Sequence, residues 1–88
     1  SLAAHERDGR PVNVRIAHWM IARTLRDMKR FDEALAIQLR LEREWAAAGT
    51  DDPYVFEELE QLYRATGDVA QADRYAERLR AARQRERQ

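Results

Sequence analysis

The feature that most limits how this chain can fold is an apolar spacing of three and four residues, which recurs in four segments. This spacing places side chains along one stripe of an α-helix. None of the four segments alternates with the period of two that is typical of a strand. Glycine, proline and charged residues interrupt the pattern at positions 9–11, 29–30, 49–53 and 67–68, so the sequence predicts four helices joined by short connections.

The predicted helices have matching start and stop signals. Asp52 before Pro53 is an N-cap followed by a first-turn proline, and Asp68 with Gln71 fits a capping box. Glycines at positions 49 and 67 stand where a left-handed residue ends a helix. The helices are predicted over residues 14–28, 31–48 and 54–66 and from residue 69.

Each predicted helix has one stripe of apolar residues that we expect to face the core. In chain order, the four stripes are Val14, Ala17, Ile21, Leu25 and Met28; Phe31, Ala34, Ile37, Leu41, Trp45 and Ala48; Val55, Phe56, Leu59, Leu62 and Tyr63; and Val69, Ala72, Ala76, Leu79 and Ala82.

The two halves of the chain match each other when the sequence is shifted by 38 residues. A fixed period of this length is typical of helical repeat proteins, in which one helix pair cannot bury its own apolar stripe and a second pair stacks on it. The shift superimposes Ile21 on Leu59, Leu25 on Tyr63, Arg26 on Arg64, Phe31 on Val69, Ala34 on Ala72 and Leu41 on Leu79.

The segments LRDMKRFDEALAIQLRL and LYRATGDVAQADRYAERL resemble the middle of a tetratricopeptide repeat. In that family the positions of Ala34 and Ala72 lie where the two helices of a pair touch, Gly67 matches the inter-helix glycine and Tyr63 the first-helix aromatic residue. The resemblance implies an all-α, right-handed superhelix of two antiparallel helix pairs. Residues 1–88 would then form a single domain, with repeats at about 14–48 and 53–86.

The sequence also departs from the family pattern. Lys29 stands at the glycine position of the first repeat, Glu60 is a poor match for a small residue, and His18 replaces a large apolar residue. The period is 38 residues instead of about 34, which we assign to the loop at 46–53 and an added helical turn. Leu2, Ala3 and Ala4, in the leader over residues 1–11, fit either the end of an upstream helix or a disordered tail.

Composition excludes several classes of protein. The chain has no cysteine, and its 16 basic and 16 acidic residues balance, so neither a disulfide framework nor binding to nucleic acid or a membrane is expected. Fifteen of the basic residues are arginine, which we interpret as the base composition of a bacterial genome. No apolar run spans a bilayer, and the start lacks a signal peptide's apolar core. A cytoplasmic location is expected, although an exported protein freed of its signal would look the same.

No set of side chains in the sequence indicates catalysis. His5 and His18 are the only histidines, and neither has the spaced partners that a metal site needs. Ser1 is the only serine, and the acidic clusters at 51–52 and 57–60 are explained by helix capping and solvation. The arginine-rich end at 78–87 is interpreted as a solvated terminal helix. We therefore predict a protein that is not an enzyme and has no cofactor or metal.

The surplus of apolar residues on the first helix is the strongest functional hint. In the resembling family this side of each first helix lines a groove that binds a peptide or protein. Arg23 and Arg64 keep an acidic segment possible as the partner. The alternative is that the surplus packs against an upstream repeat or a second copy, as a C-terminal capping or homodimerisation segment. The predicted partner-binding residues are Ile16, Trp19, Met20, Arg23, Tyr54, Glu57, Gln61 and Arg64.

Overall fold

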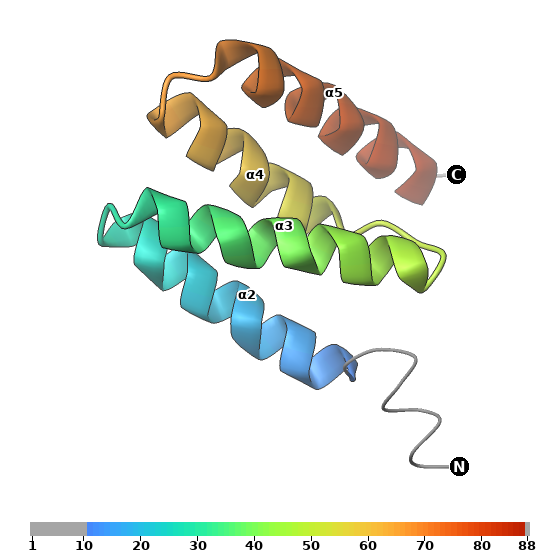
Figure 1. Cartoon of the computed structure of the whole chain (residues 1–88). Coiled ribbons are helices and arrows are strands. Elements are labelled where there is room, and N and C mark those ends of the chain that lie inside the picture. Colours follow the sequence, from blue (N-terminus) through green and yellow to red (C-terminus); the bar gives the residue numbers. More distant parts are fainter. Residues whose placement is uncertain (1–10, 88) are drawn as a thin grey trace.

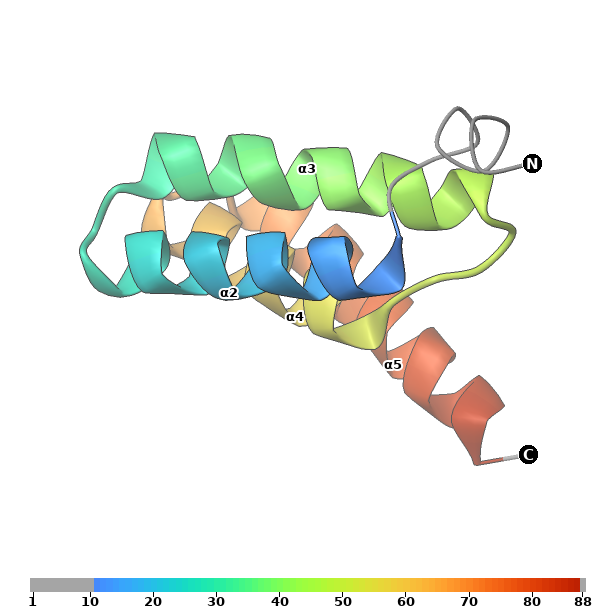
Figure 2. The same ribbon diagram turned by 90° about the horizontal axis from the view of Figure 1, so that it is seen from below.

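The computed structural model describes residues 11–87, and this part of the chain is all-helical. Its helices are α2 (Val12–Asp27), α3 (Phe31–Ala47), α4 (Pro53–Ala65) and α5 (Val69–Glu86). Figure 1 shows them side by side in chain order, with α2 and α5 at opposite edges of the molecule. Seen from below, α5 crosses the α2–α3 pair obliquely (Figure 2). The leader residues Leu2, Ala3 and Ala4, and also Ser1 and His5, lie outside the described residues.

The N-caps at Asp52 and Asp68 act as the sequence predicts, although the Asp68 backbone N–H donates to the Tyr63 carbonyl and not to Gln71, so the capping box is only half formed. The Asp52 carboxylate accepts a hydrogen bond of 2.9 Å from the backbone N–H of Tyr54, and the Asp68 carboxylate accepts one of 3.2 Å from Gln71. Each bond satisfies an N–H that the first helical turn leaves without an intrahelical partner. The start of α2 is earlier than predicted, because Pro11 occupies the N-cap position and α2 begins at Val12.

The turns within the two helix pairs have the same backbone geometry. Gly67, between α4 and α5, has φ +84°, in the left-handed region that glycine enters without strain. Lys29, at the equivalent place between α2 and α3, has φ 63°. A side chain with a Cβ atom is disfavoured there by about 1–2 kcal/mol. The first pair therefore makes the same turn as the second, with a less suitable residue.

The core lies around α4, which packs against α3 on one side and α5 on the other. The buried stripe predicted for α4 is confirmed at Val55, Phe56, Leu59 and Leu62. Tyr75 of α5 belongs to the core too, although the predicted stripe omitted it. Its ring stacks on Tyr63 with centroids 5.8 Å apart, and its hydroxyl donates a 2.9 Å hydrogen bond to Glu42.

The predicted core stripe of α2 is wrong at three of its five residues, whereas Val14 and Leu25 are half-buried. Ala17, Ile21 and Met28 are exposed, whereas the buried residues of this helix are Arg15 and Ala22. The face of α2 that packs on α3 is therefore rotated from the predicted one. Since α2 has apolar residues around most of its circumference, the spacing alone could not decide which side faces inward. The predicted core members Ala48 and Val69 lie at helix ends and are exposed as well.

Burial agrees at three of the six pairs that the 38-residue shift superimposes. Ala34 and Ala72 are both fully buried, Leu41 and Leu79 are both buried, and Leu25 and Tyr63 are both half-buried. The largest difference is at Ile21, which is 51% exposed, while its counterpart Leu59 is 0% exposed. Phe31 and Arg26 are half-buried, whereas their counterparts Val69 and Arg64 are exposed. Leu59 lies on the central helix, whereas α2 has no described helix on its far side (Figure 1).

Besides Arg15, two polar side chains, Glu58 and Gln38, are buried. The Glu58 carboxylate, 2% exposed, accepts hydrogen bonds of 2.8 and 3.1 Å from the Arg26 guanidinium and so joins α4 to α2. This hydrogen-bonded pair raises the pKa of Arg26 above its ordinary value. The Gln38 side-chain amide is fully buried on α3, and among the described residues it has no hydrogen-bond partner.

Candidate interaction surface

A hollow that we name the Trp19 pocket lies where α2 meets the start of α4. Its volume is about 290 Å³, and its walls are mainly apolar. The indole N–H of Trp19 donates a hydrogen bond of 3.2 Å to the backbone carbonyl of Tyr54, and the two rings meet edge to face with centroids 6.2 Å apart. The pocket is lined by Arg15, Ile16, Trp19, Trp45, Asp52 and Tyr54.

The start of α4 positions one wall of this pocket. Pro53 at the first helical position and the Asp52 cap determine where α4 begins, and so where Tyr54 lies. Burial raises the pKa of the Asp52 carboxyl, although the hydrogen bond from the Tyr54 N–H acts in the opposite direction. The pocket therefore combines aromatic walls with a carboxyl group that is partly withdrawn from water.

Two guanidinium groups stand at the aromatic walls. The Arg15 guanidinium carbon is 4.6 Å from the centroid of the Trp45 ring, and that of Arg23 is 5.8 Å from the Trp19 ring. Both distances fit cation–π contacts. Arg15 is buried, whereas Arg23 is exposed and forms no ion pair with a carboxylate of residues 11–87. Arg23 thus leaves a positive charge beside an apolar hollow.

Half of the predicted partner-binding residues come together here. Ile16, Trp19 and Tyr54 line the Trp19 pocket, and Arg23 lies against Trp19. Met20 lies elsewhere, in a separate hollow of about 270 Å³ that it lines with Ile21, Thr24 and Leu25. The first helix thus presents two surfaces instead of one.

Of the partner-binding residues predicted on the second helix pair, only Tyr54 lines the Trp19 pocket. The Glu57 carboxylate pairs with Arg83 of α5 at 2.7 Å. Arg64 pairs with Glu60 at 2.9 Å and with Asp73 at 3.3 Å, so its charge is compensated within the protein. Gln61 is exposed on α4. Among residues 11–87, Arg64 has carboxylate partners and Arg23 has none, so an acidic partner would find only Arg23 uncompensated by this part of the chain.

Sequence reasoning missed Arg15, Trp45 and Asp52 as pocket residues. Arg15 lies four residues before Trp19, a spacing that places both on one side of α2, so this signal was present in the sequence. Trp45 was assigned wholly to the core, but it is only half-buried and one side of it contributes to the pocket. Asp52 was recognised only as a helix cap.

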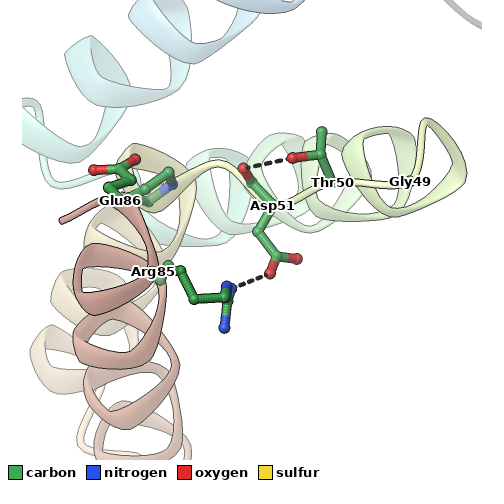
Figure 3. A pocket seen from close by; sticks show the side chains of 7 residues that line it. Gly49, Thr50, Asp51, Arg85 and Glu86 are labelled. Atoms are coloured by element: carbon green, nitrogen blue, oxygen red, sulfur yellow. Dashed lines mark hydrogen bonds and ion pairs between the residues drawn. The ribbon is translucent and has the colours of Figure 1, made fainter. Parts of the chain in front are cut away.

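A second hollow, of about 340 Å³, lies between the α3–α4 connection and the end of α5. In Figure 3 the Arg85 guanidinium reaches Asp51, and the two groups form an ion pair of 2.7 Å. Thr50 donates to the backbone carbonyl of Asp51 on the same loop. The charges here connect the loop to α5, and the labelled side chains include no nucleophile–base pair.

The arginine-rich end of α5 is largely neutralised by carboxylates of the same chain. Arg78 pairs with Glu42 at 2.7 Å, and Arg80 pairs with Glu77 on its own helix. Arg83 and Arg85 pair with Glu57 and Asp51, as described above. Arg78, Arg80, Arg83 and Arg85 therefore each have a carboxylate partner within residues 11–87.

Within residues 11–87, no three histidine, cysteine, aspartate or glutamate side chains are grouped so that they could hold a metal ion. None of the helices in this range is both long and apolar enough to span a bilayer. Comparison of the chain with protein-family models, with curated proteins and with solved structures gives no significant match.

Proposed function

We propose that this chain is a non-catalytic interaction module, built as two tetratricopeptide-like helix pairs, that binds a protein or peptide partner through the Trp19 pocket. The observation that carries the proposal is the junction of the two first helices, where Trp19 of α2 and Tyr54 of α4 enclose an apolar hollow beside Arg23. Aromatic and arginine side chains around a pocket are the groups that dominate the binding energy of protein interfaces. A cytoplasmic location remains a prediction.

The chemistry of the pocket indicates the kind of peptide it would bind. An aliphatic or aromatic anchor fits between Ile16, Trp19, Trp45 and Tyr54, and its burial would supply most of the affinity. Arg23, next to Trp19, would favour an acidic residue flanking the anchor through a charge-assisted hydrogen bond. The proposed ligand is therefore a peptide with one large apolar side chain and an acidic neighbour.

The two tryptophans of the chain make this proposal directly measurable, because both line the pocket. We would select peptides from a display library against the protein and titrate the selected sequences while following tryptophan fluorescence. A selected peptide is expected to change the emission and to bind at least about tenfold more weakly to Tyr54→Ala, a loss of about 1.4 kcal/mol. Tyr54→Ala retains the backbone carbonyl that accepts the Trp19 hydrogen bond.

The matched control is Val69→Ala, which truncates an exposed apolar residue in the first turn of another helix. Val69→Ala should leave peptide affinity unchanged. Arg23→Ala should weaken acidic peptides and leave versions with the acid replaced by its amide unaffected. If the library yields no binder down to about millimolar dissociation constants, or if Tyr54→Ala binds as tightly as the wild type, the pocket is not the binding site.

The alternative function, capping or homodimerisation, depends on a different surface. It is favoured by the exposed apolar residues on the far side of α2, which do not line the Trp19 pocket.

A further inference from the structure

The side of α2 turned away from α3 is apolar and has no described helix on it. We name the exposed residues Ala17, Met20, Ile21 and Thr24 the outer face of α2. In Figure 1, α2 forms one edge of the molecule. The hollow of about 270 Å³ lined by Met20, Ile21, Thr24 and Leu25 lies on this face. A helix that is apolar on its outer as well as its inner side is typical of a helix that is buried on both.

The repeat within the chain supports this interpretation independently. A shift of 38 residues places the four outer-face positions of α2 on four positions of α4. Those α4 positions are all buried, because α4 lies between neighbouring helices, whereas their α2 counterparts are all exposed. The pairs are Ala17 with Val55, Met20 with Glu58, Ile21 with Leu59 and Thr24 with Leu62.

The opposite edge of a second copy is poorly suited to cover this face. Leu35 and Leu39 of α3 pack against the core around α4, but the shift by 38 residues places Asp73 and Glu77 of α5 at those positions. Both acids are exposed, and Glu77 pairs with Arg80 on the same side of α5. Packing α2 of another molecule on this side would bury these charges at a large desolvation penalty. Head-to-tail stacking of copies is therefore disfavoured.

A two-fold pairing of α2 with itself places no carboxylate at the centre of the contact, because the outer face has no charged residue. Met20 lies at the middle of α2, seven residues from Asn13 and seven from Asp27. In an antiparallel pair with Met20 at the two-fold axis, Asn13 faces Asp27 of the second copy. Ile16, which lies at the border with the Trp19 pocket and also lines it, faces Thr24 of the second copy. The Asn13 amide can donate a hydrogen bond to the facing carboxylate at both ends, and apolar contacts fill the centre.

From this symmetry we infer that the outer face of α2 binds a second copy of this chain, as an antiparallel pair of α2 helices with Met20 at the two-fold axis. The interface would be small, because it consists mainly of one helix from each molecule. Its dissociation constant is therefore expected in the range of about 10–500 μM, at the weak end for protein pairs.

Sedimentation equilibrium over concentrations from about 5 μM to 1 mM tests the inference. The wild-type mass should rise from monomer towards dimer and stop there, since a two-fold pair closes on itself. Met20→Glu should remain monomeric throughout, with unchanged helical circular dichroism. Val69→Glu is the matched control, because Val69 and Met20 are both 59% exposed and Val69 lies on the α5 edge. Val69→Glu should dimerise as the wild type does.

Disulfide trapping tests the geometry, and the chain is suited to it because it has no cysteine of its own. Met20→Cys should form a covalent dimer under mild oxidation, whereas Val69→Cys should not. A mixture of Ile16→Cys and Thr24→Cys should give the mixed disulfide in preference to either homodimer, since these positions face each other only in the antiparallel register. Preference for the two homodimers would contradict that register.

Two results would overturn the inference. One is a wild-type protein that stays monomeric to about 1 mM, which would assign the outer face to a different occupant, such as another helical repeat. The other is a dimer that Met20→Glu leaves intact. The peptide-binding test is separate, because Tyr54→Ala should dimerise normally and Met20→Glu should still bind the selected peptides.

Discussion

The two edges of the molecule, α2 and α5, come from matching halves of one sequence but end in different surfaces. The outer face of α2 exposes Met20 and Ile21, whereas the corresponding side of α5 carries the exposed charges Asp73, Glu77 and Arg80. An outer helix whose far side is charged can face water without further packing. An outer helix whose far side is apolar exposes surface that water does not favour. The comparison teaches that a repeat can retain its internal packing positions while its two ends diverge.

The contacts that attach each edge helix to the centre differ as well. A network in which Glu42 accepts from both Tyr75 and Arg78 joins α5 to α3. The contacts from α2 to α4 include the buried Arg26–Glu58 pair and the Trp19–Tyr54 contact. The α5 edge is therefore held by polar contacts within the chain and has a charged outer side. The α2 edge has an apolar outer side that is exposed.

The largest expected difference between the edges is at the matched pair Leu59 and Ile21. Leu59→Ala should lower the free energy of unfolding by about 3 kcal/mol, because Leu59 is fully buried and its truncation leaves a cavity. Ile21→Ala, in dilute monomeric protein, should lower it by less than about 1 kcal/mol, since the side chain is half exposed. Urea denaturation measures both. Equal losses would contradict the difference in burial on which the comparison depends.

The next effect concerns Glu58, whose counterpart on α2 is Met20. Glu58→Met should lower the free energy of unfolding by about 2–3 kcal/mol, below the usual value for breaking a buried pair because the Arg26 side chain is 24% exposed. The reciprocal change Met20→Glu should alter the stability of the monomer by less than about 0.5 kcal/mol. In the double variant Arg26→Leu with Glu58→Met, most of the loss should be recovered. Failure to recover would mean that the ion pair is not the source of the loss.

A smaller effect on the free energy of unfolding is expected at alkaline pH, and it comes from Tyr75 of α5. Burial and the hydrogen bond to Glu42 raise the pKa of Tyr75 to about 12. The folded state therefore keeps the phenol proton at a pH where the unfolded chain, with a tyrosine pKa near 10, loses it. The stability due to this proton is complete below about pH 10 and falls by about 2–3 kcal/mol as the pH rises to about 12.

In Tyr75→Phe this alkaline decrease should be smaller by the same amount, although the variant is less stable at neutral pH because it lacks the bond to Glu42. Thermal unfolding of the wild type and of Tyr75→Phe at several pH values measures this alkaline decrease in stability. At the equivalent position of the first pair, Ile37, no ionisable group is present, so Ile37→Val should retain the full decrease. An unchanged alkaline decrease in Tyr75→Phe would show that Tyr75 ionises normally in the folded protein.

The smallest effect is expected in the turns. Lys29→Gly should raise the free energy of unfolding by about 1 kcal/mol, because it removes the penalty of a left-handed residue with a Cβ atom. The matched change Gly67→Lys should lower it by about the same amount. A Cβ atom added at Gly67 would have no other atom within 4 Å. Gly67→Lys therefore tests backbone strain without a steric clash. Effects of opposite sign would confirm that the two turns are equivalent, and a destabilising Lys29→Gly would contradict it.

Much of the local structure could be predicted from the sequence. The segments, the Asp52 and Asp68 caps and the left-handed glycines all follow from short-range chemistry, and the core stripe of α4 was correct because its apolar residues lie mainly on one side. The stripe of α2 was wrong because apolar residues lie on both of its sides, so that no single direction is favoured by spacing.

The candidate site was only partly predictable for a related reason. Trp19 and Tyr54 were both identified, but nothing in their separation of 35 residues shows that the indole of one would reach the backbone carbonyl of the other. The pairing of Arg64 with Asp73 and of Glu57 with Arg83 was also invisible in the sequence, and it removed both residues from the set able to bind a partner.

What the sequence determined by itself is where helices begin and end, because capping, turn geometry and helical period depend on residues a few positions apart. What only the tertiary structure decided is which side of each helix faces the core and which charges remain available. Those outcomes depend on the neighbours that each helix acquires, and α4 has a neighbour on both sides whereas α2 and α5 each have one open side. On α5 that side is charged, and on α2 it is apolar, which is the physical basis of the dimer that we propose at the α2 edge.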